Sequence, residues 1–148
     1  MAARIRRAVV AVALALLMAS ALAGAAWAAT LVGTNGPDTL TGTEGPDTLY
    51  GLSGFDTLNG KPGDDELYSG KGEDTLRGGK GADYLVGGSS LDTFFGGNGN
   101  DFLDAADGGP DDVLCGRGKA DRAAVDEDDI ATGCEIINGE PAARPADY

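Results

Sequence analysis

A nine-residue repeat runs through the middle of this sequence and constrains its fold more than any other feature. Aspartate recurs at every ninth position over eight copies: Asp38, Asp47, Asp56, Asp65, Asp74, Asp83, Asp92 and Asp101. A large apolar residue stands two positions after each aspartate: Leu40, Leu49, Leu58, Leu67, Leu76, Leu85, Phe94 and Leu103. Glycine stands two and five positions before the aspartates, with Ser90 and Ser69 as the exceptions. Columns in register over so many copies indicate a repeat architecture, in which each unit builds one segment of a coil.

The repeat resembles the RTX (repeats-in-toxin) calcium-binding nonapeptide, whose pattern is G-G-x-G-x-D-x-U-x with U a large apolar residue. The resemblance extends from Gly33 to Asp104, and residues 78–86 and 96–104 fit every fixed position. It implies an all-β fold, a secreted bacterial type of protein and calcium as the ligand.

Departures from this pattern cluster in the first copies. The second glycine is replaced by Thr34, Thr43, Leu52 and Lys61. Pro37 and Pro46 precede the first two aspartates, so we expect those turns to be stiffer or to bind more weakly. Ser90 makes the turn that ends at Asp92 the weakest interior match, although we still expect its carboxylate to bind.

The repeat predicts a right-handed parallel β-roll, a β-solenoid of about four 18-residue coils. Glycine permits positive φ, so we expect a six-residue turn followed by a three-residue strand that points its leucine inward. Two repeats complete one coil, and aspartates eighteen residues apart then stack along one edge. One edge carries Asp38, Asp56, Asp74 and Asp92, and the other carries Asp47, Asp65, Asp83 and Asp101.

Stacked carboxylates about 5 Å apart repel each other unless a divalent cation lies between them. Calcium accepts six to eight oxygen ligands and mixes carbonyls with carboxylates, whereas magnesium requires a stricter octahedron. We therefore predict Ca²⁺ as the ligand and the eight repeat aspartates as metal ligands. Four aspartates on each edge enclose three intervals, which predicts about six complete sites.

Two other interpretations of the repeat stay open, a flexible acidic linker and a metal-free β-solenoid whose aspartates only make turn hydrogen bonds. A linker does not require apolar residues in phase with its acids. The 25 glycines and 6% aromatic residues leave little material for an ordinary core, and the net charge of −13 opposes compaction. We therefore expect metal binding and folding to be coupled.

Residues 1–28 are typical of a secretory signal peptide. Three arginines precede an uncharged apolar run at residues 8–23, and Ala26-Trp27-Ala28 predicts cleavage near Ala28–Ala29. The alternative is an uncleaved anchor, although the run is shorter than the 18 or more residues of a typical span. Cleavage would leave 8 basic and 24 acidic residues, a net charge of −16, which disfavours nucleic acid as a partner. We predict a secreted, extracellular protein with no membrane span in the mature chain.

The ninefold phase is lost after Asp104, so we expect the β-roll to span residues 29–104, with a capping segment at 105–138 and a flexible tail at 139–148. Cys115 and Cys134 are the only cysteines, and an even count in an exported chain predicts a disulfide; a two-thiolate zinc site is the alternative. The stretch 115–137 resembles the cysteine-bracketed ending of some secreted RTX-like proteins. The acidic run 126–129 is interpreted as a solvated loop or as a further ion site.

The sequence predicts calcium binding rather than catalysis, because it contains no histidine and its serines have no evident base beside them. The alternative function is a calcium-dependent adhesion or matrix module, with an unidentified protein or cell-surface partner. Its contact patch would consist of Tyr50, Tyr68, Tyr84, Phe95 and Phe102. An ice-binding face would use Thr39, Thr57, Thr75 and Thr93, but β-propensity on an outward strand face explains that column.

Overall fold

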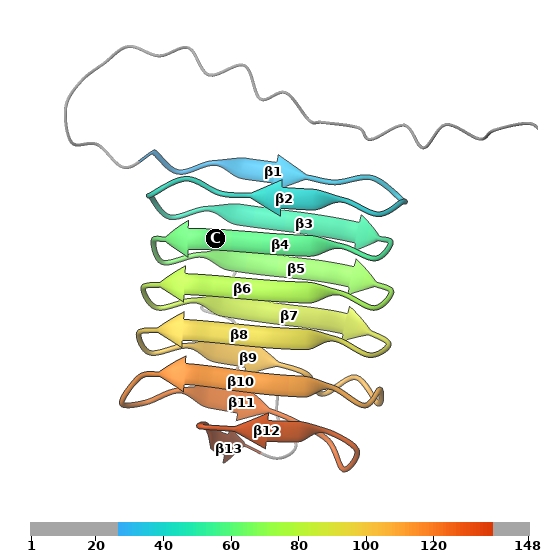
Figure 1. Cartoon of the computed structure of the whole chain (residues 1–148), viewed down its shortest axis with the longest axis vertical. Coiled ribbons are helices and arrows are strands. Elements are labelled where there is room, and N and C mark those ends of the chain that lie inside the picture. Colours follow the sequence, from blue (N-terminus) through green and yellow to red (C-terminus); the bar gives the residue numbers. More distant parts are fainter. Residues whose placement is uncertain (1–26, 138–148) are drawn as a thin grey trace, which may run out of the picture.

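Two parallel β-sheets face each other in the computed structural model, which describes residues 27–137 (Figure 1). The seven-stranded sheet contains β1 (Thr30–Val32), β3 (Thr48–Ser53), β5 (Glu66–Lys71), β7 (Tyr84–Ser89), β9 (Phe102–Asp104), β11 (Arg122–Ala124) and β13 (Glu135–Ile137). The six-stranded sheet contains β2 (Thr39–Thr41), β4 (Thr57–Pro62), β6 (Thr75–Lys80), β8 (Thr93–Asn98), β10 (Asp112–Arg117) and β12 (Ile130–Thr132). Successive strands alternate between the sheets, so two strands complete one coil.

The strand register repeats every eighteen residues through the repeat region. In the larger sheet Leu49 pairs with Leu67 and Leu67 with Leu85, and in the smaller sheet Leu58 pairs with Leu76. Every pairing between strands is parallel, and the described residues contain no helix. The prediction of an all-β parallel solenoid with 18-residue coils is confirmed.

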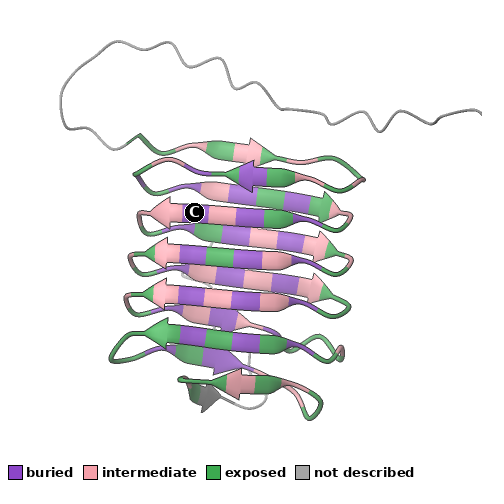
Figure 2. Ribbon diagram, in the orientation of Figure 1, coloured by how far each residue is buried: buried purple, intermediate pink, exposed green. Residues whose placement is uncertain are grey.

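The core is a pair of apolar columns between the two sheets. Along each strand buried and less buried residues alternate, as Figure 2 shows in purple, pink and green. The leucines at the inward position are fully buried from Leu49 onward, whereas Leu40 in the first coil keeps 5% of its surface exposed. Each coil of the repeat region therefore contributes one large side chain from each sheet, and stacking of coils is what excludes water from them.

The strands are longer than the repeat predicted. In the middle coils each strand has six residues, and β3 turns both Leu49 and Gly51 inward. The turn before β4 therefore contains only residues 54–56 rather than six residues. A Cβ on Gly51 would lie 2.7 Å from the carbonyl oxygen of Ser69, so the first glycine of the motif is required by close strand packing and not by a turn.

The segment expected to be a separate cap continues the solenoid. Strand β10 pairs with β8, and β11 pairs with β9, so the structure has about six turns rather than four. The sequence phase is lost because Asp111 follows its counterpart Asp92 by 19 residues and Asp121 follows Asp101 by 20. The extra residues lie in turns, where they do not disturb the parallel pairing.

A disulfide joins Cys115 of β10 to Cys134, the residue just before β13, with a Cα–Cα distance of 5.4 Å. Cys115 is fully buried in the core. The disulfide prediction is confirmed, and no free thiol is left for the zinc alternative.

The outer faces of the two sheets differ. The face of the larger sheet carries a row of rings, in which Tyr50 stacks on Tyr68 with centroids 5.2 Å apart and Tyr84 stacks on Phe102 at 5.2 Å. Phe95 lies on the smaller sheet instead, with the Arg77 guanidinium 4.2 Å from its ring centroid. The five aromatic residues of the predicted contact patch therefore do not form one surface.

The threonine column of the smaller sheet is in register, since Thr39 pairs with Thr57, Thr57 with Thr75 and Thr75 with Thr93. The next residues in that column are Asp112 and Ile130, so the uniform row ends there.

The signal-peptide prediction for residues 1–28 and the tail prediction for 139–148 lie almost wholly outside the described residues, which include only Trp27 and Ala28 of the former. Between residues 27 and 137 the structure has no helix with the length and apolar character needed to cross a membrane.

Three non-glycine residues between 27 and 137 adopt positive φ, and two of them replace the second glycine of the motif: Leu52 (φ 80°) and Lys61 (φ 84°). A side chain in this region costs roughly 1–2 kcal/mol because Cβ approaches the following carbonyl oxygen. We predict that Leu52→Gly and Lys61→Gly each raise the free energy of unfolding by about 1 kcal/mol. Urea unfolding at one fixed calcium concentration measures this effect.

Ser53→Gly is the matched control, because Ser53 follows Leu52 in β3 and is not among the residues with positive φ. It should lower stability by roughly 0.5–1 kcal/mol through backbone entropy. Equal losses in Leu52→Gly and Ser53→Gly would contradict the strain at Leu52.

Candidate metal sites

The turns of the solenoid place the repeat aspartates in two stacked columns, one on each edge. Each interior aspartate follows a short turn and precedes a strand, so its side chain points back under the turn. The columns are those that the sequence predicted, and they continue through Asp111 and Asp129 on one edge and Asp121 on the other. From Asp47 to Asp121 the carboxylates of the columns are buried.

From Asp47 onward, Oδ1 of each column aspartate accepts a backbone N–H from the preceding coil and so links two coils. The backbone N–H of Asp38 donates to Oδ1 of Asp56 at 2.8 Å, and the N–H of Asp56 donates to Oδ1 of Asp74 at 2.7 Å. The other edge repeats this contact, with the N–H of Asp65 donating to Oδ1 of Asp83 at 3.0 Å. We call this chain of contacts the aspartate ladder. It joins each turn to the turn eighteen residues later.

The second oxygen of most ladder carboxylates has no hydrogen-bond donor, although it is buried. Unpartnered Oδ2 atoms belong to Asp56, Asp65, Asp74, Asp83, Asp92, Asp101 and Asp111. A buried carboxylate oxygen without a partner is strongly unfavourable, and native proteins rarely leave one unless an ion satisfies it. These atoms are the feature that fits a bound cation.

Backbone carbonyls supply further oxygens beside these carboxylates. A Cβ on Gly51 would lie 2.6 Å from Oδ2 of Asp56 as well as 2.7 Å from the Ser69 carbonyl oxygen, so both oxygens lie over the same glycine. Within the described part of the chain no three acidic, histidine or cysteine side chains come together as a metal cluster. A cation in these turns would therefore combine carboxylate with carbonyl oxygens, which is a ligand set that suits calcium.

The first two turns differ from the rest, at the positions where threonine replaces the second glycine. Thr34 donates both its backbone N–H and its hydroxyl to Oδ2 of Asp38, the hydroxyl at 2.9 Å. Thr43 makes the same two contacts with Oδ2 of Asp47, the hydroxyl at 3.1 Å. The protein itself satisfies these two carboxylates, a difference that the sequence pattern flagged only as a departure.

The turn with Ser90 keeps the geometry of its neighbours. Ser90 adopts φ 101°, in the region that the usual glycine occupies easily. Asp92 is fully buried, its Oδ1 accepts the N–H of Asp74 at 2.8 Å, and its Oδ2 has no donor. Replacing glycine here has not removed the features that the other interior turns share.

Two carboxylates of the acidic run 126–129 accept backbone N–H groups of neighbouring turns, while Glu127 and Asp128 are exposed. Asp126 accepts the backbone N–H of Gly108 through Oδ2 at 2.7 Å, and Asp129 accepts that of Asp111 through Oδ1 at 2.9 Å. The N–H of Asp126 in turn donates to Oδ2 of Asp129 at 2.8 Å. These two carboxylates hold the last turn of this edge.

Burial in the turns raises the pKa of the ladder carboxyls above their ordinary value, and neighbouring carboxylates add to the effect. Desolvation raises the pKa of Asp56, Asp65 and Asp101 to about 6. It raises the pKa of Asp83 and Asp111 to about 7 and that of Asp92 to about 8. The metal-free turns thus hold a proton on these carboxyls up to a higher pH than an exposed aspartate does, and a cation would compete with that proton.

Together these features define a parallel β-solenoid with carboxylate and carbonyl oxygens stacked along both edges. The chain matches the model of the RTX calcium-binding nonapeptide repeat (4 copies) over residues 32–67, 50–85 and 77–109. The matches cover residues 32–109, more than half of the 148-residue chain, and the chain belongs to this family. No curated protein and no solved structure matches it.

The raised pKa values predict how the metal-free protein responds to pH. Each affected aspartate binds its proton more tightly folded than unfolded, so its contribution to stability is complete below about pH 4 and is lost as pH rises through about 6 to 8. We predict that protonation partly replaces the metal, so that in chelator the β-sheet signal in circular dichroism is larger at pH 5 than at pH 8.

The control separates the ladder from general charge repulsion. Asp92→Asn removes the group with the highest of these pKa values and should flatten the dependence on pH, whereas Asp112→Asn removes an exposed carboxylate and should not. A chain with more β-sheet in chelator at pH 8 than at pH 5 would contradict the prediction.

Proposed function

We propose that this chain is a secreted calcium-binding protein whose ions lie between stacked turns and whose solenoid folds when they bind. The observation that carries the proposal is the row of buried Oδ2 atoms without donors, at Asp56, Asp65, Asp74, Asp83, Asp92 and Asp101 among the predicted ligands. Calcium would supply the positive charge that these atoms lack. Family membership supports the same ligand.

The number of ions follows from which carboxylates are already satisfied. Six of the eight predicted ligands have an unpartnered Oδ2, and the remaining two, Asp38 and Asp47, are held by Thr34 and Thr43. We propose that the six bind calcium and that the first two turns form a metal-independent start of the coil. The sequence-based prediction of about six sites agrees with this count.

Coupled folding follows from the electrostatics of the ladder. Neighbouring carboxylates along an edge repel each other, and burial removes the water that would screen them. The apolar core provides at most one large side chain from each sheet in each coil. A chain with this core and this acidity needs counter-charge inside its turns before its coils can stack.

Secretion is supported by three features. Proteins with RTX repeats are typically secreted, the disulfide between Cys115 and Cys134 suits an oxidising compartment, and residues 1–28 have the pattern of a signal peptide. The backbone nitrogen of Ala29 donates to Oδ1 of Asp47 at 2.6 Å, so cleavage before Ala29 would leave the new α-amino group beside a carboxylate. Mass spectrometry of the exported protein identifies its first residue.

A non-enzymatic role is part of the proposal, because the buried carboxylates are committed to the ladder. Adhesion is the second candidate, and the ring row of the larger sheet is the surface that would serve it. Tyr50 and Tyr68 stack face to face, as do Tyr84 and Phe102, so these rings cover one another and stabilise adjacent strands. Pull-down with and without calcium tests this candidate.

Circular dichroism of the full-length chain during calcium titration tests the coupling of binding and folding. We expect a cooperative change from coil to β-sheet that magnesium does not reproduce and that a chelator reverses. A chain already folded in chelator would contradict coupled folding and favour the metal-free solenoid. A chain without β-sheet at saturating calcium would contradict the proposed function itself.

Single substitutions test which aspartates bind. Asp65→Asn should bind one calcium fewer by titration calorimetry, because it removes the charge from an unpartnered Oδ2. Glu66→Gln is the matched control, since it neutralises the exposed adjacent carboxylate and should leave the count unchanged. Asp38→Asn should also leave the count unchanged, and loss of an ion there would contradict the role given to Thr34.

A further inference from the structure

Asp111 lies in the ladder although it falls off the nine-residue period and beyond the family match, which ends at residue 109. The register of β10 on β8 places Asp112 opposite Thr93, so Asp111 stands level with Asp92. Gly109-Pro110-Asp111 keeps the glycine and aspartate of the ordinary turn, and the one inserted residue lies ahead of it. A Cβ on Gly109 would lie 2.6 Å from the carbonyl oxygen of Ser90, as the corresponding glycines lie against the carbonyls of their preceding turns.

The carboxylate of Asp111 shares three features with the six interior ligands: the contact of Oδ1 with the preceding coil, the burial of the side chain and the unpartnered Oδ2. Its Oδ1 accepts the backbone N–H of Asp92 at 2.7 Å, while its own N–H donates to Oδ1 of Asp129 at 2.9 Å. The side chain is 3% exposed, and Oδ2 is buried without a donor. An orphaned oxygen in this position points to a ligand that the main chain does not provide.

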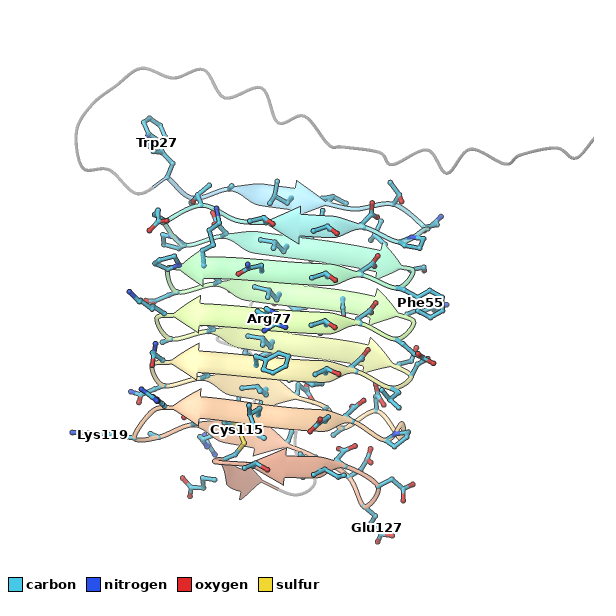
Figure 3. All side chains as sticks on the ribbon, in the orientation of Figure 1. Trp27, Phe55, Arg77, Cys115, Lys119 and Glu127 are labelled. Carbon is cyan, nitrogen blue, oxygen red and sulfur yellow. A yellow bond between two sulfur atoms is a disulfide. The ribbon has the colours of Figure 1, made fainter. Side chains whose placement is uncertain are left out.

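The surroundings of this turn add negative charge. Asp107 accepts the N–H of Gly109 through Oδ1 at 2.8 Å, and a Cβ on that glycine would lie 3.1 Å from the same oxygen. Asp126 holds the N–H of Gly108 from the following coil. Figure 3 places Glu127 at this edge and Lys119 at the opposite edge.

We propose that Asp111 binds a further divalent cation through its unpartnered Oδ2 together with backbone carbonyl oxygens. The cation is calcium, as proposed for the regular repeats. This inference rests on the proposed function and adds a seventh ion to the six of the regular repeats. The ion binds the turn between β9 and β10, so it joins the irregular C-terminal coils to the repeat region. The same edge of the solenoid then carries metal past the point where the sequence period ends.

Calcium counting in two neighbouring variants of the full-length chain tests the proposal. Asp111→Asn keeps an oxygen that accepts the N–H of Asp92 but lowers the charge, and we expect it to bind one calcium fewer than the parent chain in titration calorimetry. Asp112→Asn makes the same charge change at an exposed position one residue away and should bind the full number. Equal counts in the parent chain and Asp111→Asn overturn the inference while leaving the proposed function in place.

A measurement on the unsubstituted chain guards against misfolding of the variant. On calcium addition the ¹³C NMR signal of the Asp111 side-chain carboxyl should shift as far as that of Asp92 and saturate with it, whereas that of the exposed Asp112, which reports folding alone, should shift less. A carboxyl signal of Asp111 that shifts no further than that of Asp112 overturns the inference. If the parent chain binds no calcium and neither signal shifts, the proposed function fails as well.

Discussion

The structure depends on the buried aspartates of the turns, in which one carboxylate oxygen is hydrogen-bonded and the other has no partner. Oδ1 accepts a main-chain N–H from the previous coil, as Asp74 does from Asp56, and this contact holds successive turns at the spacing of the strands. Oδ2 is buried without a donor, so the same residue that joins the coils also leaves a charge uncompensated. The same side chain therefore holds the coils together and requires a cation. Because every interior turn has this arrangement, the solenoid as a whole responds to whatever occupies its edges, whether a proton or a metal ion.

The strands and the turns tolerate irregularity to different degrees. Parallel hydrogen bonding and the inward leucines require that each strand stays in register with the strand one coil earlier, and this register continues from β8 to β10 and β12. A turn needs only to return the chain to the next strand, so one extra residue before Asp111 and one more between Asp111 and Asp121 are accommodated there. The ladder contact is remade after each insertion, because the aspartate is positioned by the strand that follows it rather than by the length of the turn.

Several features of the fold could be read from the sequence, and several could not. The column of leucines predicted the core, and the eighteen-residue spacing assigned each repeat aspartate to its edge. The spacing did not reveal that Gly51 belongs to a strand, because glycine permits both a turn and close strand packing. It also did not reveal that Thr34 would satisfy Asp38 in the first turn, since that depends on where a hydroxyl lies in three dimensions.

The sequence by itself determined the repeat unit, the inward column, the alternation of edges and the acidic character of the turns, because these follow from a period that is visible along the chain. Only the tertiary structure decided that the solenoid continues past residue 104 and which carboxylate oxygens lack a partner. Both depend on contacts between residues eighteen to twenty apart, such as Asp101 with Asp121, whose spacing departs from the period while their place in the coil does not. A periodic pattern records equal spacing along the chain, whereas stacking requires only equal position in space.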